Sequence, residues 1–254
     1  MDLRKSFDVD PEGYDKYRPR CCDEMLADMI EYAELAPGKT VLEVGPGTGQ
    51  ATEPILKTGC SYLAIELGEN FTEFMTNKFA SYDNFQIVNA DFENYDFGCD
   101  RFDLVYAATA FHWIPEKIGY PKAFDILKSG GTFAILTWAF PESGALDEPQ
   151  QTQCQEVYKK HYKHFYSELP STSRLDYEAR GKYGFADLER REYRSFREMN
   201  ADDYVALRRT NSDILELQEP HKSNVLEELR QVILNNGDYV KLNDVWTLYL
   251  ARKP

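Results

Sequence analysis

Three glycines at alternate positions follow a short apolar segment and could bring main-chain atoms against a ligand. Residues 41–44 read Val-Leu-Glu-Val and run directly into Gly45, Gly47 and Gly49. Glycine has no Cβ and reaches backbone angles closed to other residues, so such a turn lets a ligand touch the main chain. The spacing is G-x-G-x-G with Pro46 inside, whereas a pyrophosphate-binding turn has G-x-G-x-x-G. The loop therefore predicts a ligand site in which a pyrophosphate is disfavoured, and a plain tight turn is the alternative.

Two acidic residues stand where a nucleoside would need them. Glu66 closes an apolar segment seventeen positions after Gly49, so its carboxylate could accept both hydroxyl protons of a ribose. Asp91 follows the next apolar segment and is suited to the exocyclic amine of an adenine. Each acid alone could equally be the N-cap of a helix after its strand. The ordered set of glycine loop, Glu66 and Asp91 favours a binding site.

Aromatic and imidazole side chains follow a fourth apolar segment. Phe111, His112 and Trp113 come just after residues 102–107, at the edge where open α/β sheets place ligands. We expect Trp113 to contact ligand or cofactor, and His112 is a candidate general base. The alternative is that the two large rings belong to the core and His112 is a satisfied hydrogen-bonding group.

Basic and tyrosine side chains in the second half are candidates for contact with a substrate. In a chain of net negative charge, Arg208 could be retained for a carboxylate. Tyr158, Tyr162 and Tyr166 recur at four-residue spacing, which more often marks a packed helix face. The five cysteines show no Cys-x-x-Cys pair and no histidine at metal-ligand spacing, so no metal site is expected.

Short apolar segments alternate with helical patterns through the first half of the chain. A helical pattern over residues 23–36 ends at a Pro-Gly turn and precedes the first segment. Five segments, each followed by glycine or acid and then a helical stretch, predict a parallel, doubly wound α/β sheet. These segments are residues 40–44, 62–65, 85–88, 102–107 and 132–137.

After residue 138 this regularity is lost. The chain becomes polar and helical in pattern, then strand-like, then helical again, and it ends on a β-prone stretch that suits a last strand. These stretches are residues 141–170, 190–196, 201–209 with 223–236, and 245–251. We therefore predict a core with its N-terminal segment over 1–138. Residues 139–254 are predicted to hold an insertion after strand five, about 139–189, and the return of the chain to the same sheet.

Charge and cysteine usage restrict the class of protein. The chain has 254 residues, with 43 acidic against 29 basic side chains and a formal charge of −14. This charge creates a negative field that repels phosphate backbones and anionic lipid. We therefore expect neither nucleic acid nor membrane as a partner, and no stretch approaches the roughly 18 apolar residues of a membrane helix. Unpaired cysteines and the lack of an apolar leader predict a soluble, unexported, cytoplasmic protein.

Taken in order, these motifs resemble the class I S-adenosylmethionine-dependent methyltransferases. The shared motifs are E-x-G-x-G-x-G after strand one, an acid closing strand two, Ala-Asp after strand three, Phe-Asp-Leu-Val in strand four and Gly-Gly-x-x-x-Ile-Leu in strand five. This resemblance covers roughly the first half of the chain. Residues 14–19, 111–113 and 209–212 resemble the small-molecule branch that includes trans-aconitate methyltransferase.

The resemblance implies a Rossmann-like, mostly parallel sheet of seven strands with the seventh antiparallel. The methionine end of S-adenosylmethionine is then expected at Glu43 and the glycine loop, the ribose at Glu66, and the adenine at Asp91 and Phe92. The cofactor-binding residues implied in this way are Glu43, Gly45, Gly47, Gly49, Glu66, Leu67, Asp91, Phe92 and Ala107.

The implied function is an enzyme that transfers a methyl group from S-adenosylmethionine to a small-molecule acceptor, leaving S-adenosylhomocysteine. Transfer from a sulfonium is an in-line displacement, and holding the reactants in line can contribute roughly 7 to 11 kcal/mol. A base such as His112 helps a hydroxyl or neutral amine acceptor, whereas a carboxylate is already nucleophilic. Two alternatives stay open: a non-catalytic S-adenosylmethionine-binding protein, and an NAD-dependent oxidoreductase, which the glycine spacing and Asp91 disfavour.

An N-terminal segment, about residues 7–20, is a candidate helical lid. It gathers Tyr14, Tyr17, Arg18 and Pro19 before the first core helix, a composition unusual for a disordered tail. We expect it to close over the cofactor and supply the tyrosines and Arg18 to the active site, because closing segments exclude water from transfer sites. The alternative is a tail helix packed for stability alone.

Overall fold

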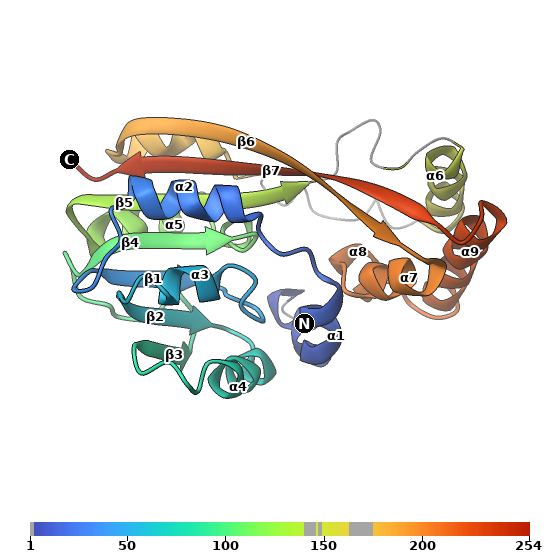
Figure 1. Ribbon diagram of the computed structural model, residues 1–254, viewed down its shortest axis with the longest axis horizontal. Coiled ribbons are helices and arrows are strands. Elements are labelled where there is room, and N and C mark those ends of the chain that lie inside the picture. The colour runs from blue at the N-terminus through green and yellow to red at the C-terminus, as the bar shows by residue number, and fades with distance from the viewer. Residues whose placement is uncertain (1–2, 140–145, 147–148, 163–174) are drawn as a thin grey trace. The chain divides into compact units, whose positions relative to one another are not determined.

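The computed structural model of the chain describes residues 3–139, 146, 149–162 and 175–254 (Figure 1). These residues form two units, each assembled from separate stretches of sequence. The sheet unit holds residues 19–138, 175–193 and 246–254. The helical unit holds residues 3–18, 139, 146, 149–162 and 194–245.

A seven-stranded sheet has the order β3-β2-β1-β4-β5-β7-β6. The pairs β1–β2, β2–β3, β1–β4 and β4–β5 are all parallel, and Figure 1 shows β7 running opposite to β5 and β6. Because β1 lies beside β4, the sheet grows outward in both directions from this pair, which makes it the switch point where such sheets bind ligands. The strands are β1 (Thr40–Val44), β2 (Ser61–Glu66), β3 (Phe85–Asn89), β4 (Phe102–Ala108), β5 (Leu127–Ala139), β6 (Ala186–Met199) and β7 (Val240–Arg252).

Apolar cores lie on both faces of the sheet. One core joins buried side chains of α2 (Asp23–Tyr32), α3 (Thr52–Leu56) and α4 (Glu69–Lys78) to strand residues such as Val41. The other joins α5 (Glu116–Ile126) and the short helix η3 (Tyr177–Tyr183) to strand residues such as Leu42. Val41 and Leu42 serve opposite cores because side chains alternate along a strand. The central strands are therefore buried on both faces, which accounts for their apolar sequences.

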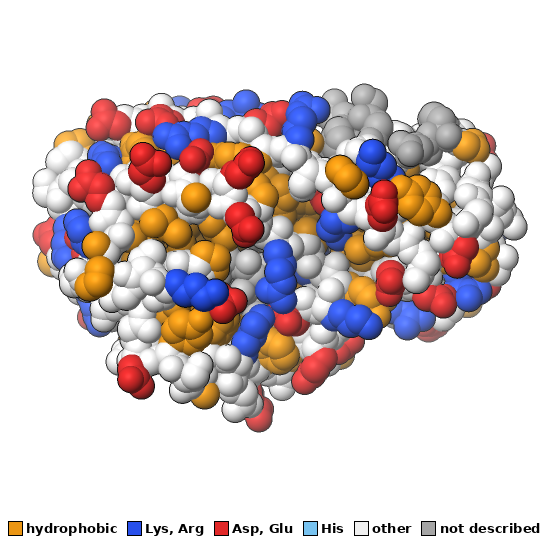
Figure 2. All heavy atoms as spheres, in the orientation of Figure 1, with side chains coloured by type: hydrophobic (Ala, Val, Ile, Leu, Met, Phe, Trp, Pro, Cys, Tyr) orange, Lys and Arg blue, Asp and Glu red, His pale blue; other side chains and the backbone are white. Residues whose placement is uncertain are grey.

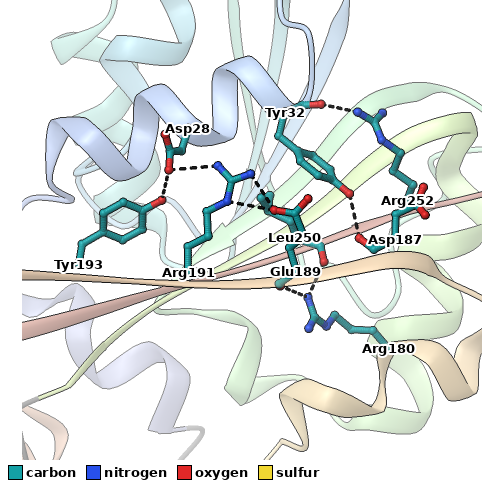
Figure 3. Close-up of polar contacts among 9 residues, drawn as sticks. All are labelled: Asp28, Tyr32, Arg180, Asp187, Glu189, Arg191, Tyr193, Leu250 and Arg252. Atoms are coloured by element: carbon teal, nitrogen blue, oxygen red, sulfur yellow. Dashed lines mark hydrogen bonds and ion pairs between the residues drawn. The ribbon is translucent and has the colours of Figure 1, made fainter.

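Polar side chains join α2 to the edge strand β6 (Figure 3). Arg191 pairs with Asp28 at 3.1 Å, and Tyr193 donates its hydroxyl proton to the same carboxylate. The hydroxyl of Tyr32 donates to the carbonyl of Asp187 over 2.9 Å. Figure 2 shows acidic and basic side chains intermingled over α2 and β6. Charged side chains on an edge strand hinder its pairing with another chain.

The helical unit surrounds an apolar core of its own. Leu207, Leu229 and Ile233 are fully buried in this core. The helix α9 packs against α6 and α7, α1 packs against α7, and the 3₁₀ helix η1 packs against α8. The described helices are η1 (Leu3–Val9), α1 (Pro11–Tyr17), α6 (Gln150–His161), α7 (Ala201–Arg209), α8 (Ser212–Leu215) and α9 (His221–Asn235). Within the described part of the chain, no helix has the length and hydropathy needed to cross a membrane.

The α/β fold and the seven-stranded sheet predicted from the sequence are confirmed, with differences at element ends. The helix that follows the glycine loop, α3, begins at Thr52 after a turn. The helix expected over 23–36 ends at Tyr32, because Glu34 takes a positive φ of 51° that no helix continues. The insertion predicted over about 139–189 overlaps β6, and its residues 140–145, 147–148 and 163–174 lie outside the described chain, Tyr166 included.

Candidate functional site

The glycine loop lies at the switch point of the sheet, beside the segment that follows β4. A Cβ added to Gly45 would lie 2.7 Å from the Cβ of Ala110, so the two loops are in close contact. Thr109, between β4 and Ala110, adopts a left-handed φ of 54°, a conformation that costs a threonine energy. Backbone strain of this kind concentrates at functional sites, where packing holds it in place. The sequence offered no signal for Thr109.

All three glycines of the loop have positive φ angles. Gly45, Gly47 and Gly49 have φ angles of 65°, 58° and 83°, which other residues adopt only with strain. A Cβ on Gly49 would approach a ring carbon of Phe79 to 2.7 Å. The ammonium of Lys78 donates to the carbonyl of Thr48 over 2.8 Å. The three glycines are therefore needed for the backbone conformation, and the tight turn is tied to α4.

The carboxylate of Glu66 links the ends of β1 and β2. Its Oε2 accepts the main-chain N–H of Gly47 over 3.0 Å, and its Oε1 accepts that of Gly68 over 2.9 Å. The side chain is only 7% exposed. An ionised carboxylate can accept several hydrogen bonds, so a carboxylate held by both loops is also of the right type to accept ligand hydroxyls. The structure thus brings Glu66 and the glycine loop together, as the sequence predicts.

Glu43 is directed into the core below the loop. Its Oε2 accepts the hydroxyl protons of Thr52, at 2.6 Å, and of Tyr62, whose oxygen is 2.5 Å from that of Tyr106. Burial raises the pKa of Glu43 above its ordinary value. Its Oε1 is buried and has no hydrogen-bond partner among the described residues. A buried acceptor without a donor is costly, so a ligand N–H or a water at this point would stabilise the site.

Asp91 and Phe92 begin the connection between β3 and β4. The Oδ1 of Asp91 accepts the main-chain N–H of Glu93 over 2.9 Å and so closes a local turn, and no helix follows within the described residues 90–101 for which Asp91 could be the N-cap. Phe92 is buried and packs on Phe97, with ring centroids 5.7 Å apart. The adenine-binding roles of Asp91 and Phe92 stay predictions, supported by their place two strands from the glycine loop at the same edge.

The other predicted cofactor residues differ in exposure. Leu67 is partly exposed between Glu66 and Gly68, where a ligand bound to the carboxylate could touch it. Ala107 is completely buried within β4 in the apolar core, so it presents no surface at the sheet edge as the structure stands. A role for Ala107 stays a prediction and would be limited to shaping the core beneath the site.

The 3₁₀ helix η2 (Phe111–Trp113) presents its three side chains differently. Phe111 is fully buried, which agrees with the core alternative for this ring. His112 is exposed and Trp113 half-buried, and their ring centroids lie 5.3 Å apart. The imidazole and the indole thus stand at the strand edge next to the strained Thr109, where the sequence placed a base and a ligand wall. Their roles stay predictions.

The predicted lid residues contact other parts of the helical unit. Arg18 donates to the carbonyl of Thr210 over 2.8 Å, and its guanidinium lies 5.0 Å from the ring centre of Tyr14. Tyr17 packs against the core of the same unit. These contacts give α1 a structural role within its own unit. The lid function of this segment stays a prediction.

Arg208, the predicted substrate residue, is buried in the helical unit. Its guanidinium pairs with Asp213 at 2.6 Å and lies 5.1 Å from the ring centre of Tyr158. Its Nε has no hydrogen-bond partner among the described residues. Tyr158 and Tyr162 contact each other and belong to this cluster, so the tyrosine spacing marks a packed helix face as the alternative held. Across the described ranges, no cluster of acids, histidines and cysteines could hold a metal ion.

Comparison with known proteins matches the first half of the chain to methyltransferases. Residues 41–131 match a family model described as a methyltransferase domain. Ribosomal RNA small subunit methyltransferase A of Clostridium acetobutylicum is 36% identical over 113 residues, covering 44% of this chain and 41% of that protein. Sterol 24-C-methyltransferase of Saccharomyces cerevisiae is 30% identical over 123 residues, covering 46% and 32%. The chain spans about a quarter to two fifths of the length of such relatives.

A solved structure shares the fold along the entire chain. Phosphoethanolamine N-methyltransferase 2 of Haemonchus contortus, in complex with phosphomonomethylethanolamine and S-adenosylhomocysteine, superposes with a TM-score of 0.60. The match covers 100% of this chain and 60% of that one at 17% identity, a level that shows the fold. The segment that carries the glycine loop and Glu66 at the switch point, residues 41–131, is thus similar to a methyltransferase domain.

Proposed function

We propose that this chain is an S-adenosylmethionine-dependent methyltransferase acting on a small molecule. The observation that carries the proposal is the Glu66 carboxylate, held by the N–H groups of Gly47 and Gly68 at the switch point of the sheet. An acid fixed beside a glycine loop can accept ribose hydroxyls at the edge where open α/β sheets bind their ligands. The match of residues 41–131 to a methyltransferase domain supports the same cofactor.

The site fits this cofactor in two further respects. The buried Oε1 of Glu43, beneath the predicted methionine end, has no hydrogen-bond partner among the described residues, and Gly45 and Gly47 are only partly buried in the loop above it. When bound, S-adenosylmethionine supplies a methyl group already activated on a sulfonium. The residues of the chain then have to bind and orient the reactants and exclude water, and no metal is required.

A small-molecule acceptor is favoured over nucleic acid. The formal charge of −14 opposes approach of a phosphate backbone, although some relatives are ribosomal RNA methyltransferases. Others are named for a sterol and for phosphoethanolamine. Within this class we propose a carboxylate acceptor, as in the trans-aconitate branch that residues 14–19, 111–113 and 209–212 resemble. Such an acceptor needs no base, and His112 would then position groups and not remove a proton.

Calorimetry with two cofactors tests the binding half of the proposal. The wild-type chain should bind S-adenosylmethionine and S-adenosylhomocysteine and should not bind NAD. Binding of NAD alone would favour the oxidoreductase alternative, and binding of neither would remove the cofactor assignment altogether.

A coupled assay tests the catalytic half. Release of S-adenosylhomocysteine is followed with pools of small carboxylic acids, amines, phenols and sterols, and in a separate arm with ribosomal RNA. Turnover with a small-molecule pool supports the proposal, and turnover with RNA alone contradicts it. Binding without turnover in any arm, including a total metabolite extract, would favour a non-catalytic cofactor-binding protein.

A further inference from the structure

The connection between β3 and β4 carries Asp91 and Phe92 but contains no helix. It runs over residues 90–101, all of which the structure describes, and leads from the edge strand β3 past β2 and β1 to β4. Neighbouring strands lie about 4.8 Å apart, so the connection crosses about 14 Å of sheet. A long connection without secondary structure needs side-chain anchors to hold one conformation.

Lys122, on α5, supplies such an anchor. Its ammonium donates to the carbonyl of Tyr95 over 2.6 Å and to that of Glu93 over 3.1 Å. It also lies 5.4 Å from the ring centre of Phe92 and 5.5 Å from that of Phe97. This one side chain therefore contacts four residues between positions 92 and 97. It bonds to the main chain of two of them and makes cation–π contacts with the rings of the other two.

Hydrogen bonds to Asp91 close a turn within the same connection. The N–H of Tyr95 returns to the carbonyl of Asp91 over 3.0 Å, and the N–H of Glu93 donates to the Asp91 carboxylate. Lys122 thus bonds to the carbonyls of Glu93 and Tyr95, the two residues whose N–H groups bond to Asp91. Next to this turn is a cavity of about 560 Å³ that is lined by residues of the connection and of α5, among them Tyr95, Lys117 and Lys122.

We propose that Lys122 is a positioning residue for the adenine side of the cofactor site. It touches no predicted cofactor contact except the ring of Phe92, and it acts by fixing the turn that presents Asp91 and Phe92. This inference rests on the proposed S-adenosylmethionine site and adds a residue to it that no motif of the sequence indicates.

The test is binding of S-adenosylhomocysteine and of methylthioadenosine, which keeps the adenosine and lacks the amino acid. Lys122→Met keeps most of the aliphatic stem and removes the charge and donors. We expect its dissociation constants for both ligands to rise about tenfold. This is the order of loss expected when hydrogen bonds from a charged group to main-chain carbonyls are removed. Lys122→Arg should restore most of the affinity. Lys117→Met, on the exposed side of the same helix, is the matched control and should bind as the wild type does.

A double-mutant comparison separates positioning from general destabilisation. In an Asp91→Ala background, Lys122→Met should weaken binding clearly less than tenfold, because the side chain it positions is gone. Full additivity, a loss confined to S-adenosylhomocysteine, or affinities of Lys122→Met within twofold of wild type would each overturn the inference. If Lys122→Met does not fold, Lys122→Gln, which keeps a donor, takes its place in the same comparison. A wild type that binds neither ligand contradicts the proposed function and this inference with it, whereas a wild type that binds both ligands with the same affinity as Lys122→Met contradicts the inference alone.

Discussion

The carboxylate of Glu66 accepts the main-chain N–H of Gly47 over 3.0 Å, so the acid that ends β2 is tied to the glycine loop that follows β1. The glycine loop and Glu66 are therefore structurally coupled. A change at either residue is expected to alter the other.

Glu66→Ala should weaken binding of S-adenosylmethionine strongly. It removes an ionised acceptor from the ribose hydroxyls, at about 1.5 to 3 kcal/mol for each bond to a charged group, and it frees the Gly47 N–H. We expect at least a tenfold higher dissociation constant by calorimetry. Glu69→Ala, an exposed acid at the start of α4, is the control and should leave the constant unchanged. Equal affinities for Glu66→Ala and wild type would contradict the ribose assignment.

Gly45→Ala should damage both stability and binding. The new Cβ would meet Ala110 at 2.7 Å and would sit on a left-handed backbone that costs a non-glycine residue about 1–2 kcal/mol. Gly38→Ala is the matched control, because Gly38 has a φ of 92° but nothing within 4 Å of an added Cβ. Thermal unfolding should show strain in both variants, and only Gly45→Ala should lose cofactor affinity.

The double variant Gly45→Ala with Ala110→Gly isolates the steric part of that effect. Removing the Ala110 methyl relieves the contact and leaves the backbone strain. Affinity should therefore recover in part. No recovery at all would mean that the close approach of the two loops is not what excludes a side chain at Gly45.

His112→Ala distinguishes two classes of acceptor. For a carboxylate acceptor, turnover should fall modestly with an unchanged pH profile, because no proton has to be removed. Loss of a limb near neutral pH would instead identify a hydroxyl or neutral amine acceptor with His112 as base. The measurement is rate against pH for wild type and variant, with His221→Ala in the helical unit as control.

Asp103 gives a pH dependence of stability that is independent of any ligand. Burial alone would raise the pKa of Asp103, but hydrogen bonds from Lys128 and from the N–H and hydroxyl of Thr40 outweigh it and lower the pKa to about 2. Because the folded-state pKa lies below the unfolded one of about 3.9, the stabilisation is complete above that value and is lost as the pH falls towards 2.

Asp103→Asn should therefore unfold at a lower temperature than wild type at neutral pH, with a difference that shrinks below pH 4. Thermal melts between pH 2 and 7 measure this. Asp83→Asn, at an exposed acid, should show no such trend. A constant difference down to pH 2 would mean that the Asp103 contacts do not depend on its charge.

The alternation of apolar segments and helical patterns predicted the fold. Individual side-chain contacts that follow no sequence pattern could not be predicted. The five apolar segments predicted β1 to β5, because strands buried in the middle of a sheet must be apolar. Glu66 and the glycine loop were found because each directly ends a strand. Lys122 was missed, since a lysine that donates to two carbonyls has no spacing that sets it apart on a helix. The inward direction of Glu43 was equally hidden, because its position in the motif does not state which face of β1 it occupies.

The place of β7 in the sheet has a consequence for synthesis of the protein. This last strand lies between β5 and β6, so β6 has β7 as its sole neighbour among the described strands. On the ribosome, β6 is complete about 40 residues before β7 begins, and it must wait without a pairing partner. An unpaired strand is an aggregation hazard, and the charged side chains along β6 reduce that hazard during the delay. A premature stop that removed residues 246–254 would leave the part of β6 that lies in the sheet unit permanently without its pairing partner.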